Sequence, residues 1–174
     1  MTAKINYSNK VSSKSLVNLV LFTDDKFNIN SLKKNLSNSE FSYLNDLLKT
    51  SNLKKNLLFF DVNSKKKIVL ISIKKNLKSF DIENLGSEFY ERINHGKNSE
   101  HFINADSVIS SYENFIGHFL HGLKLKSYEF NKYKTKKETR LISINVLGNK
   151  NKTSVLNQLK FKALEEGIFY ARDL

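Results

Sequence analysis

Cysteine, proline and tryptophan are all absent from this chain of 174 residues. Without cysteine, the chain can form no disulfide, no zinc–thiolate site and no thiol nucleophile. Without proline, it has no cis-proline turn and offers no polyproline ligand to a partner. These absences exclude disulfide scaffolds, thiol enzymes and redox switches, and the lack of cysteine favours a cytoplasmic protein.

Long hydrophobic runs are absent as well. The longest, which include Leu19–Phe22 and Ile68–Ile71, are far shorter than the roughly 18 residues that a membrane-spanning helix needs. The first six residues lack the apolar core of a signal peptide. We therefore expect a cytoplasmic protein with no membrane partner.

Positive charge is abundant, but it comes almost entirely from lysine. The formal net charge is +12, and 26 of the 29 basic residues are lysine. Proteins that bind nucleic acid tend to use arginine, because its guanidinium group makes bidentate contacts with phosphate and guanine. Enrichment in lysine and asparagine is typical of an AT-rich genome, so the charge by itself is weak evidence for a polyanionic partner.

Segments with strand and helix patterns follow one another along the chain. Apolar runs or strict alternation predict strands, and apolar residues three or four apart predict helices. Because strands interleave with helices, we expect an α/β fold with a mixed or mostly parallel sheet covered on both faces. The predicted strands are 3–8, 15–23, 56–62, 67–73, 102–109 and 139–147, and the predicted helices follow Ser37, span 81–94, follow Ser110 and run from about 153 to the end.

The ends of the predicted helices have recognisable signatures. The first and third helices start with capping-box patterns, Ser37–Glu40 and Ser110–Glu113. Asp81 is the predicted N-cap of the second helix. Gly122 is predicted to end the third helix, since glycine readily adopts the left-handed conformation after a last helical turn.

Catalytic and metal-binding motifs are missing from the sequence. His118 and His121 are spaced to share a helix face, but a metal needs further ligands and no acidic partner lies nearby in sequence. We interpret both as half-exposed residues at the end of a helix. The adjacent pairs Asp24-Asp25 and Glu165-Glu166 diverge, so they indicate a turn and a solvated helix face. We therefore predict no catalytic residue, metal ligand or cofactor within this chain.

Aromatic residues are interleaved with lysines over 124–137. Lysines can bind phosphates and aromatic rings can stack on bases, so this segment is a candidate contact with single-stranded nucleic acid. The alternative is a strand-like connector with one packed and one solvated side. The candidate contact residues are Lys124, Lys126, Tyr128, Lys132, Tyr133, Lys134, Lys136 and Lys137.

Two motifs in the last third of the chain resemble bacterial leucyl (cytosol) aminopeptidases. The pattern G-L-x-L-x-S-Y-x-F-x-x-Y-K-T over 122–135 is similar to the end of the N-terminal domain in that family. The pattern A-L-E-E-G-I-x-x-A-R-D-L over 163–174 is similar to the helix that leads into the catalytic domain, and it contains Arg172 and Asp173. The first two thirds match only in the order of their elements.

The resemblance implies a three-layer α/β sandwich with a mixed, largely parallel, macro-domain-like sheet. It assigns 1–150 to an N-terminal domain and 151–174 to an interdomain helix. In the family, a catalytic domain holds two divalent metals, zinc or manganese, and its metal-binding segments do not occur in these 174 residues. No catalytic residue of the family can therefore be assigned to a position in this sequence.

The resemblance also implies a function. The chain would be the non-catalytic assembly and access domain of a hexameric, metal-dependent aminopeptidase that releases N-terminal residues, preferentially leucine, from peptides. Its partner would be the catalytic domain of the same polypeptide. The alternative is a nucleic-acid-binding module that uses the basic surface, whereas an ADP-ribose pocket is disfavoured by the missing glycine-rich loop.

The final helix is predicted to dock poorly without a partner domain. Part of its apolar face should then remain exposed. Its predicted inward residues are Leu156, Leu159, Ala163, Leu164, Ile168 and Ala171.

Overall fold

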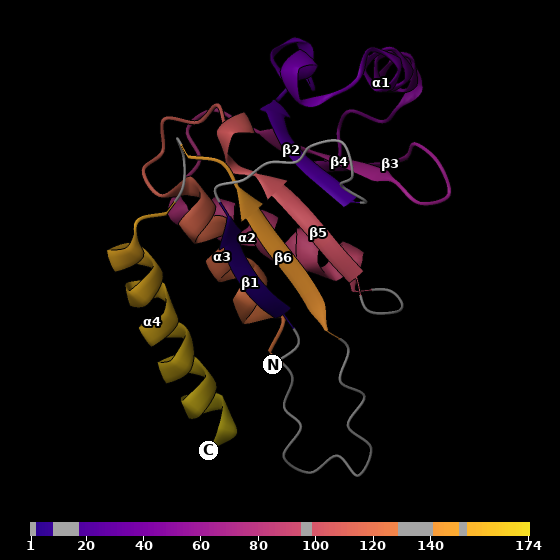
Figure 1. Ribbon diagram of the computed structural model, residues 1–174. Coiled ribbons are helices and arrows are strands. Elements are labelled where there is room, and N and C mark those ends of the chain that lie inside the picture. The colour runs from indigo at the N-terminus through magenta and orange to yellow at the C-terminus, as the bar shows by residue number, and fades with distance from the viewer. Residues whose placement is uncertain (1–2, 9–17, 95–98, 129–140, 150–152) are drawn as a thin grey trace.

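The computed structural model describes residues 3–8, 18–94, 99–128, 141–149 and 153–174, which form a six-stranded sheet with helices on both faces (Figure 1). The strand order is β1-β6-β5-β2-β4-β3, with β3 antiparallel to β4 and the other described pairs parallel. The predicted fold class, a mixed and largely parallel three-layer sandwich, is confirmed. The strands are β1 (Ala3–Ser8), β2 (Asn18–Asp24), β3 (Leu57–Asp61), β4 (Lys67–Ile73), β5 (Ser99–Asn104) and β6 (Ile142–Leu147). The helices are α1 (Asn38–Thr50), α2 (Ser79–Ile93), α3 (Phe115–Lys126) and α4 (Val155–Asp173).

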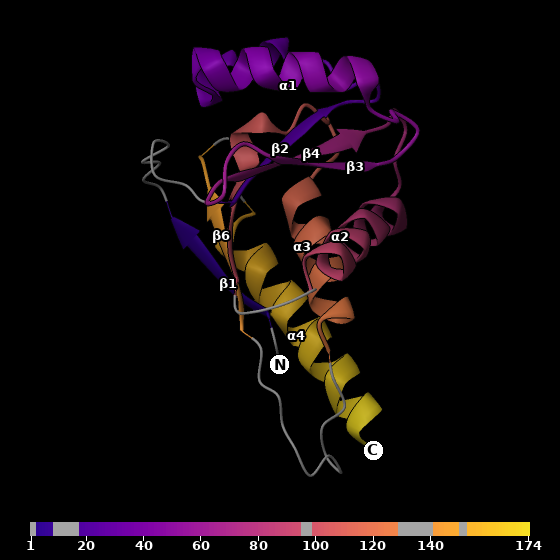
Figure 2. The same ribbon diagram turned by 90° about the vertical axis from the view of Figure 1, so that its right-hand side faces the viewer.

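The central strand β2 separates two hydrophobic cores. Leu19 and Leu21 belong to the core on the α1 side, whereas Val20 and Phe22 belong to the core that α2 and α3 cover. Figure 2 shows α1 on one side of the sheet and α2 and α3 on the other. Strand β2 lies between β4 and β5 and is covered on both faces, which is why its sequence is a nearly continuous run of apolar residues.

Helices α2 and α3 approach each other at backbone distance. A Cβ atom on Gly86 would lie 1.9 Å from the carbonyl oxygen of Phe119, and one on Gly122 would lie 1.9 Å from that of Glu83. Only glycine leaves room for such contacts. Gly122 therefore lies inside α3, which continues to Lys126, and its predicted role as the helix end is wrong.

The first capping box is confirmed and the second helix starts earlier than predicted. The Glu40 N–H donates to Ser37 Oγ at 3.2 Å, and the Ser37 N–H donates to the Glu40 carboxylate at 2.9 Å. In α2 the N-cap is Lys78, whose N–H donates to the Asp81 carboxylate at 2.9 Å. Asp81 thus stabilises the cap from inside the first turn, and its prediction as the N-cap itself is wrong.

The capping box predicted at 110–113 is also wrong. Helix α3 begins after Asn114, which has a left-handed φ of 57° and makes no side-chain cap hydrogen bond. Instead, the Ser110 hydroxyl accepts a hydrogen bond from the Tyr112 N–H at 3.0 Å, within the segment that precedes the helix. Serine can satisfy a nearby amide in a turn as readily as at a cap, so the pattern alone does not distinguish the two.

The strand predicted at 102–109 is shifted toward the N-terminus. Strand β5 ends at Asn104, and a 3-10 helix follows over Ala105–Ser107. The Asn104 side chain accepts a hydrogen bond from the Asp106 N–H at 3.0 Å, which turns the backbone away from the sheet. Most of the lysine-rich segment predicted over 124–137, from residue 129 on, lies outside the described residues.

Replacing Gly122 tests the close approach of α2 and α3. Gly122→Ala should lower the free energy of unfolding by about 2 kcal/mol or more, because the added methyl group meets backbone rather than a movable side chain. Gly167→Ala in α4 is the matched control, since no described atom lies within 4 Å of its Cβ position. This control should instead gain up to about 1 kcal/mol from helix propensity. Urea unfolding measures both, and equal stability of the two variants would contradict the packing.

His101 in β5 is a buried histidine that pairs with no charged side chain among the described residues. Its ring meets Phe89 edge-on at 5.8 Å, and Nε2 lies 3.1 Å from Ser99 Oγ. Burial, and then the positive charge of Lys67, lower the pKa of His101 from 6.5 to about 4. The folded protein therefore holds a neutral imidazole over a pH range in which the unfolded chain would protonate it.

This lowered pKa predicts an acid-sensitive stability. The unfolded state binds the extra proton below pH about 6.5, so stability should fall as the pH decreases toward about 4, by up to about 3 kcal/mol from this group. His101→Gln removes the titrating ring, and its stability should fall less over the same range. Urea unfolding at several pH values measures the difference, and identical pH profiles would refute the assignment.

Candidate functional site

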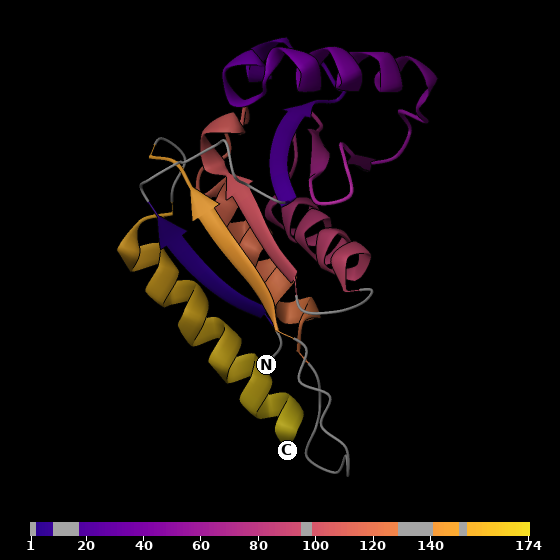
Figure 3. The ribbon, with the colours of Figure 1, turned by 45° about the vertical axis from the view of Figure 1, so that its right-hand side comes forward.

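Helix α4 lies along the edge of the domain beside α3 and β1 (Figure 3). Within it, Glu165 and Phe169 are the buried residues. Large apolar side chains point away from the domain, and Leu156 is 77% exposed and Tyr170 70% exposed. The predicted exposure of an apolar face is therefore confirmed.

The predicted inward set of α4 is wrong. Leu156, Leu159 and Leu164 are exposed, and so are Ala163 and Ala171, while Ile168 is half-buried. The side that contacts the domain instead presents Phe161, Glu165 and Phe169, at successive intervals of four residues. Helical spacing identifies an apolar face, but it does not say which neighbour covers that face.

Two histidines of α3 meet carboxylates from two different helices. His118 Nδ1 lies 2.9 Å from Glu83 Oε1 of α2, and His121 Nδ1 lies 3.0 Å from Glu165 Oε1 of α4. The Phe161 ring contacts both imidazoles, with centroids 5.1 Å from His118 and 5.2 Å from His121. His121 and Glu165 are both buried, so their hydrogen bond joins α4 to α3 inside the protein.

These contacts correct the sequence-based interpretation of His118 and His121. Both lie within α3 rather than at its end, and His121 is buried rather than half-exposed. Their acidic partners come from distant parts of the chain, which is why no partner was apparent nearby in sequence. Of the Glu165-Glu166 pair, only Glu166 lies on a solvated face as predicted.

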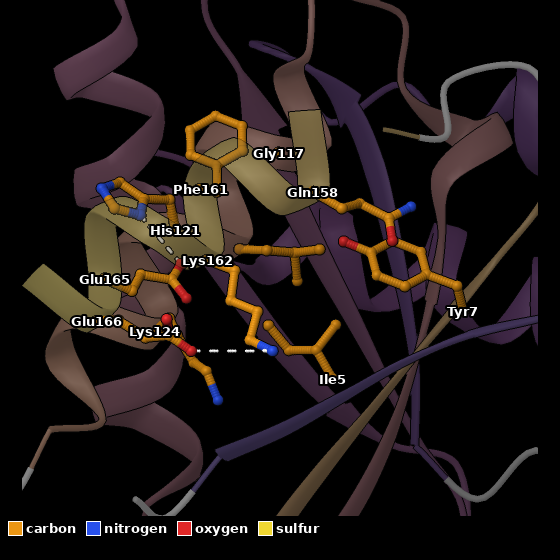
Figure 4. A pocket seen from close by; sticks show the side chains of 11 residues that line it. Ile5, Tyr7, Gly117, His121, Lys124, Gln158, Phe161, Lys162, Glu165 and Glu166 are labelled. Atoms are coloured by element: carbon orange, nitrogen blue, oxygen red, sulfur yellow. Dashed lines mark hydrogen bonds and ion pairs between the residues drawn. The ribbon is translucent and has the colours of Figure 1, made fainter. Parts of the chain in front are cut away.

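A cavity of about 270 Å³ lies between β1, α3 and α4 (Figure 4). Its apolar lining comes from all three elements, and its charged lining comes from the two helices. In Figure 4 Glu165 and Glu166 lie at one end, and Tyr7 and Gln158 at the other. The residues that line the cavity are Ile5, Tyr7, Gly117, Leu120, His121, Lys124, Gln158, Phe161, Lys162, Glu165 and Glu166.

Burial and charge perturb two titrating groups of the cavity. Burial, and then the nearby negative charge of Glu165, raise the pKa of Tyr7 to about 12. Burial lowers the pKa of Lys124, and the charge of Glu165 opposes that shift. Glu165 thus interacts with three residues of the cavity. Its carboxylate is hydrogen-bonded to His121, and its negative charge raises the pKa of Tyr7 and counteracts the lowering of the pKa of Lys124.

Residues from both sequence motifs meet at the C-terminal end of α4. The Tyr128 ring stacks on Phe169 at 4.9 Å between centroids, and the Tyr128 hydroxyl donates to Asp173. The Arg172 guanidinium lies 5.4 Å from the Tyr128 ring centroid, and its Nη1 donates to the carbonyl oxygen of Leu125 at 3.4 Å. Arg172 and Asp173 therefore fasten the last turn of α4 to the end of α3.

Three of the predicted nucleic-acid contacts lie in the described residues. Lys124 is half-buried and donates to the carbonyl oxygen of Ala3, and one face of the Tyr128 ring is covered by Phe169. Lys126 is exposed, with its Nζ 3.7 Å from the Glu91 carboxylate. The remaining candidates, Lys132, Tyr133, Lys134, Lys136 and Lys137, lie outside the described residues.

The described residues contain neither a metal-binding cluster nor a membrane-spanning helix. No group of three or more histidine, aspartate or glutamate side chains among them could hold a metal ion. None of the described helices is long and apolar enough to cross a bilayer.

Solved structures with the same fold include two aminopeptidases and a bottromycin maturation enzyme. No protein-family model and no curated protein matches the chain. A mutant of tomato leucine aminopeptidase matches over 98% of the chain with a TM-score of 0.65 and 16% identity. Cytosol aminopeptidase from Coxiella burnetii matches over 97% with a TM-score of 0.58 and 13% identity. The bottromycin maturation enzyme BotP in complex with Mn matches over 92% with a TM-score of 0.61 and 8% identity.

These likenesses establish the fold and the relative size of the chain. The match covers 37% of the tomato enzyme and 32% of each of the other two chains. The chain therefore has the fold of about one third of a leucine aminopeptidase, and the predicted resemblance to the N-terminal domain of that family is confirmed at the level of the fold.

The pairing of Glu165 with His121 predicts a specific role in holding α4. Glu165→Ala should lower the free energy of unfolding by about 1–3 kcal/mol, because it removes the carboxylate that is hydrogen-bonded to buried His121. Glu166→Ala is the matched control and should change stability by less than about 0.5 kcal/mol, because Glu166 is exposed. Urea unfolding, with hydrogen exchange of α4, measures both variants. Equal effects at the two positions would show that the buried pair does not hold the helix.

Proposed function

We propose that this chain is a non-catalytic assembly and access domain of a metal-dependent leucyl aminopeptidase. The parent enzyme would release N-terminal residues, preferentially leucine, from peptides, using two zinc or manganese ions in its catalytic domain. Residues 1–150 would form the accessory domain and 151–174 the interdomain helix. The parent would be a hexamer, and a cytoplasmic location stays a prediction from the sequence.

The outward face of α4 is the observation that carries this proposal. It exposes a row of large apolar residues, which is costly for a surface that faces only water. The row runs the length of the helix and comprises Leu156, Leu159, Tyr170 and Leu174, with Ala163 between them. A catalytic domain packed on this face would cover it.

Gly167 supports the same interpretation. It lies in the middle of α4, where glycine is less favourable than alanine by about 1 kcal/mol. No described atom lies within 4 Å of its Cβ position, so nothing in this part of the chain needs a glycine there. The closely approaching backbone of a partner domain would explain it, as Gly86 and Gly122 are explained by the contact of α2 and α3.

The relative length of the chain supports the proposal as well. The matching enzymes are about three times longer than this chain, which leaves room for a catalytic domain elsewhere in such a protein. The partner proposed for α4 is accordingly the catalytic domain of the same polypeptide.

Nucleic-acid binding remains the alternative function. The formal net charge of +12 favours it, whereas the covered ring face of Tyr128 disfavours stacking on a base at that residue. A gel-shift assay with single-stranded DNA at several salt concentrations separates the two functions, since tight binding with a steep salt dependence supports the alternative.

Peptidase activity tests the proposal. The native protein, tagged in its source cells, should carry a chelator-sensitive activity that cleaves leucine p-nitroanilide, whereas the 174-residue chain by itself with added manganese or zinc should show none. In the native protein, Leu156→Lys with Leu159→Lys should lower this activity several-fold by weakening the packing of the catalytic domain on α4, without unfolding the accessory domain, since both side chains are exposed on it. Ser42→Lys with Asn45→Lys adds the same charge on the exposed face of α1 and should retain the activity. Turnover by the isolated chain would overturn the non-catalytic role.

A further inference from the structure

The cavity under α4 combines charges of both signs with an apolar lining. Two carboxylates, Glu165 and Glu166, and two ammonium groups, Lys124 and Lys162, line it, so their formal charges balance. Figure 4 shows these four side chains gathered toward one end of the cavity. The neighbouring lining is apolar and consists of Ile5, Leu120 and Phe161.

This charge balance restricts what the cavity can bind. A ligand with a single charge would leave one sign in excess in a partly desolvated space, which is unfavourable. A ligand with an ammonium and a carboxylate group close together matches both signs at one end of the cavity. An apolar side chain on such a ligand would then contact the apolar lining.

A ligand of this kind can bind between Lys162 and Glu166, which form an exposed ion pair at the mouth of the cavity. Lys162 Nζ and Glu166 Oε1 are 3.8 Å apart, which is longer than a hydrogen bond. Both side chains are well exposed, so they can turn toward a ligand at little conformational cost. A ligand carboxylate could accept from Lys162 while its ammonium group donates to Glu166.

The size of the cavity also favours a small ligand. About 270 Å³ is slightly below the range of roughly 300–1,000 Å³ that is typical of sites for drug-sized molecules. A single amino acid fits this volume better than a nucleotide or a longer peptide does.

We propose that the cavity between β1, α3 and α4 binds a free α-amino acid with an apolar side chain. The ammonium group of the ligand faces Glu165 and Glu166, its carboxylate faces Lys162 and Lys124, and its side chain contacts Ile5, Leu120 and Phe161. Because the ligand touches all three elements, its binding stabilises the docked position of α4.

Leucine and two matched analogues test the charge requirement. Calorimetry at neutral pH with the full chain compares leucine with leucinamide, which lacks the carboxylate, and with 4-methylpentanoate, which lacks the ammonium group. Leucine is expected to bind with a Kd of about 1 mM or tighter, and each analogue at least about tenfold more weakly. The absence of saturable leucine binding up to about 10 mM, or equal binding of either analogue, overturns the proposal.

Variants of α4 locate the site. Lys162→Met should weaken leucine binding several-fold, because Lys162 lies at the mouth of the cavity. Lys160→Met is the matched control on the same helix, since Lys160 is exposed and does not line the cavity, and it should leave binding unchanged. Equal effects of the two variants, or amide shifts in NMR spectra that lie outside β1, α3 and α4, would place the ligand elsewhere and overturn the proposal. Neither measurement involves peptidase activity, so its outcome is independent of the test of the proposed function.

Discussion

The contact between the backbones of α2 and α3 is the constraint on which the site depends. At Gly86 and Gly122 the two helices touch main chain to main chain, and the Ser87 hydroxyl donates to the carbonyl oxygen of Gly122 at 3.0 Å. This contact fixes the rotation of α3 about its own axis. Phe119 then faces the sheet, while His121 and Lys124 face β1 and α4.

Helix α4 has two faces of different chemistry. Its inner face uses the buried hydrogen bond between His121 and Glu165, ring contacts of Phe161 and Phe169, and the contacts of Arg172 and Asp173 with Tyr128, which are directional interactions. Its outer face carries the large aliphatic side chains that would ordinarily form a core. This division fits the proposed role of α4 between two domains, because polar contacts would set its position on one domain and the apolar face would pack against the other.

The candidate site was only partly accessible from the sequence. Phe161, Glu165 and Phe169 recur every fourth residue, and this spacing could have identified the inner side of α4. The leucines of α4 form a stronger apolar pattern on a different face, and that pattern indicates the wrong side of the helix. The partners of Glu165 could not be found in the same way, because His121 lies 44 positions away and Tyr7 lies on the first strand.

The sequence by itself determined the strands, most helices and the fold class, because burial on one or both faces of a sheet leaves a periodic record in neighbouring residues. The apolar run of β2 and the capping box of α1 are local signals of this kind. Only the tertiary structure decided that Gly122 lies at a helix contact, that Glu165 is buried and that the leucines of α4 face outward. Each of these depends on which surfaces of distant segments meet, and a pattern within one segment does not contain that information.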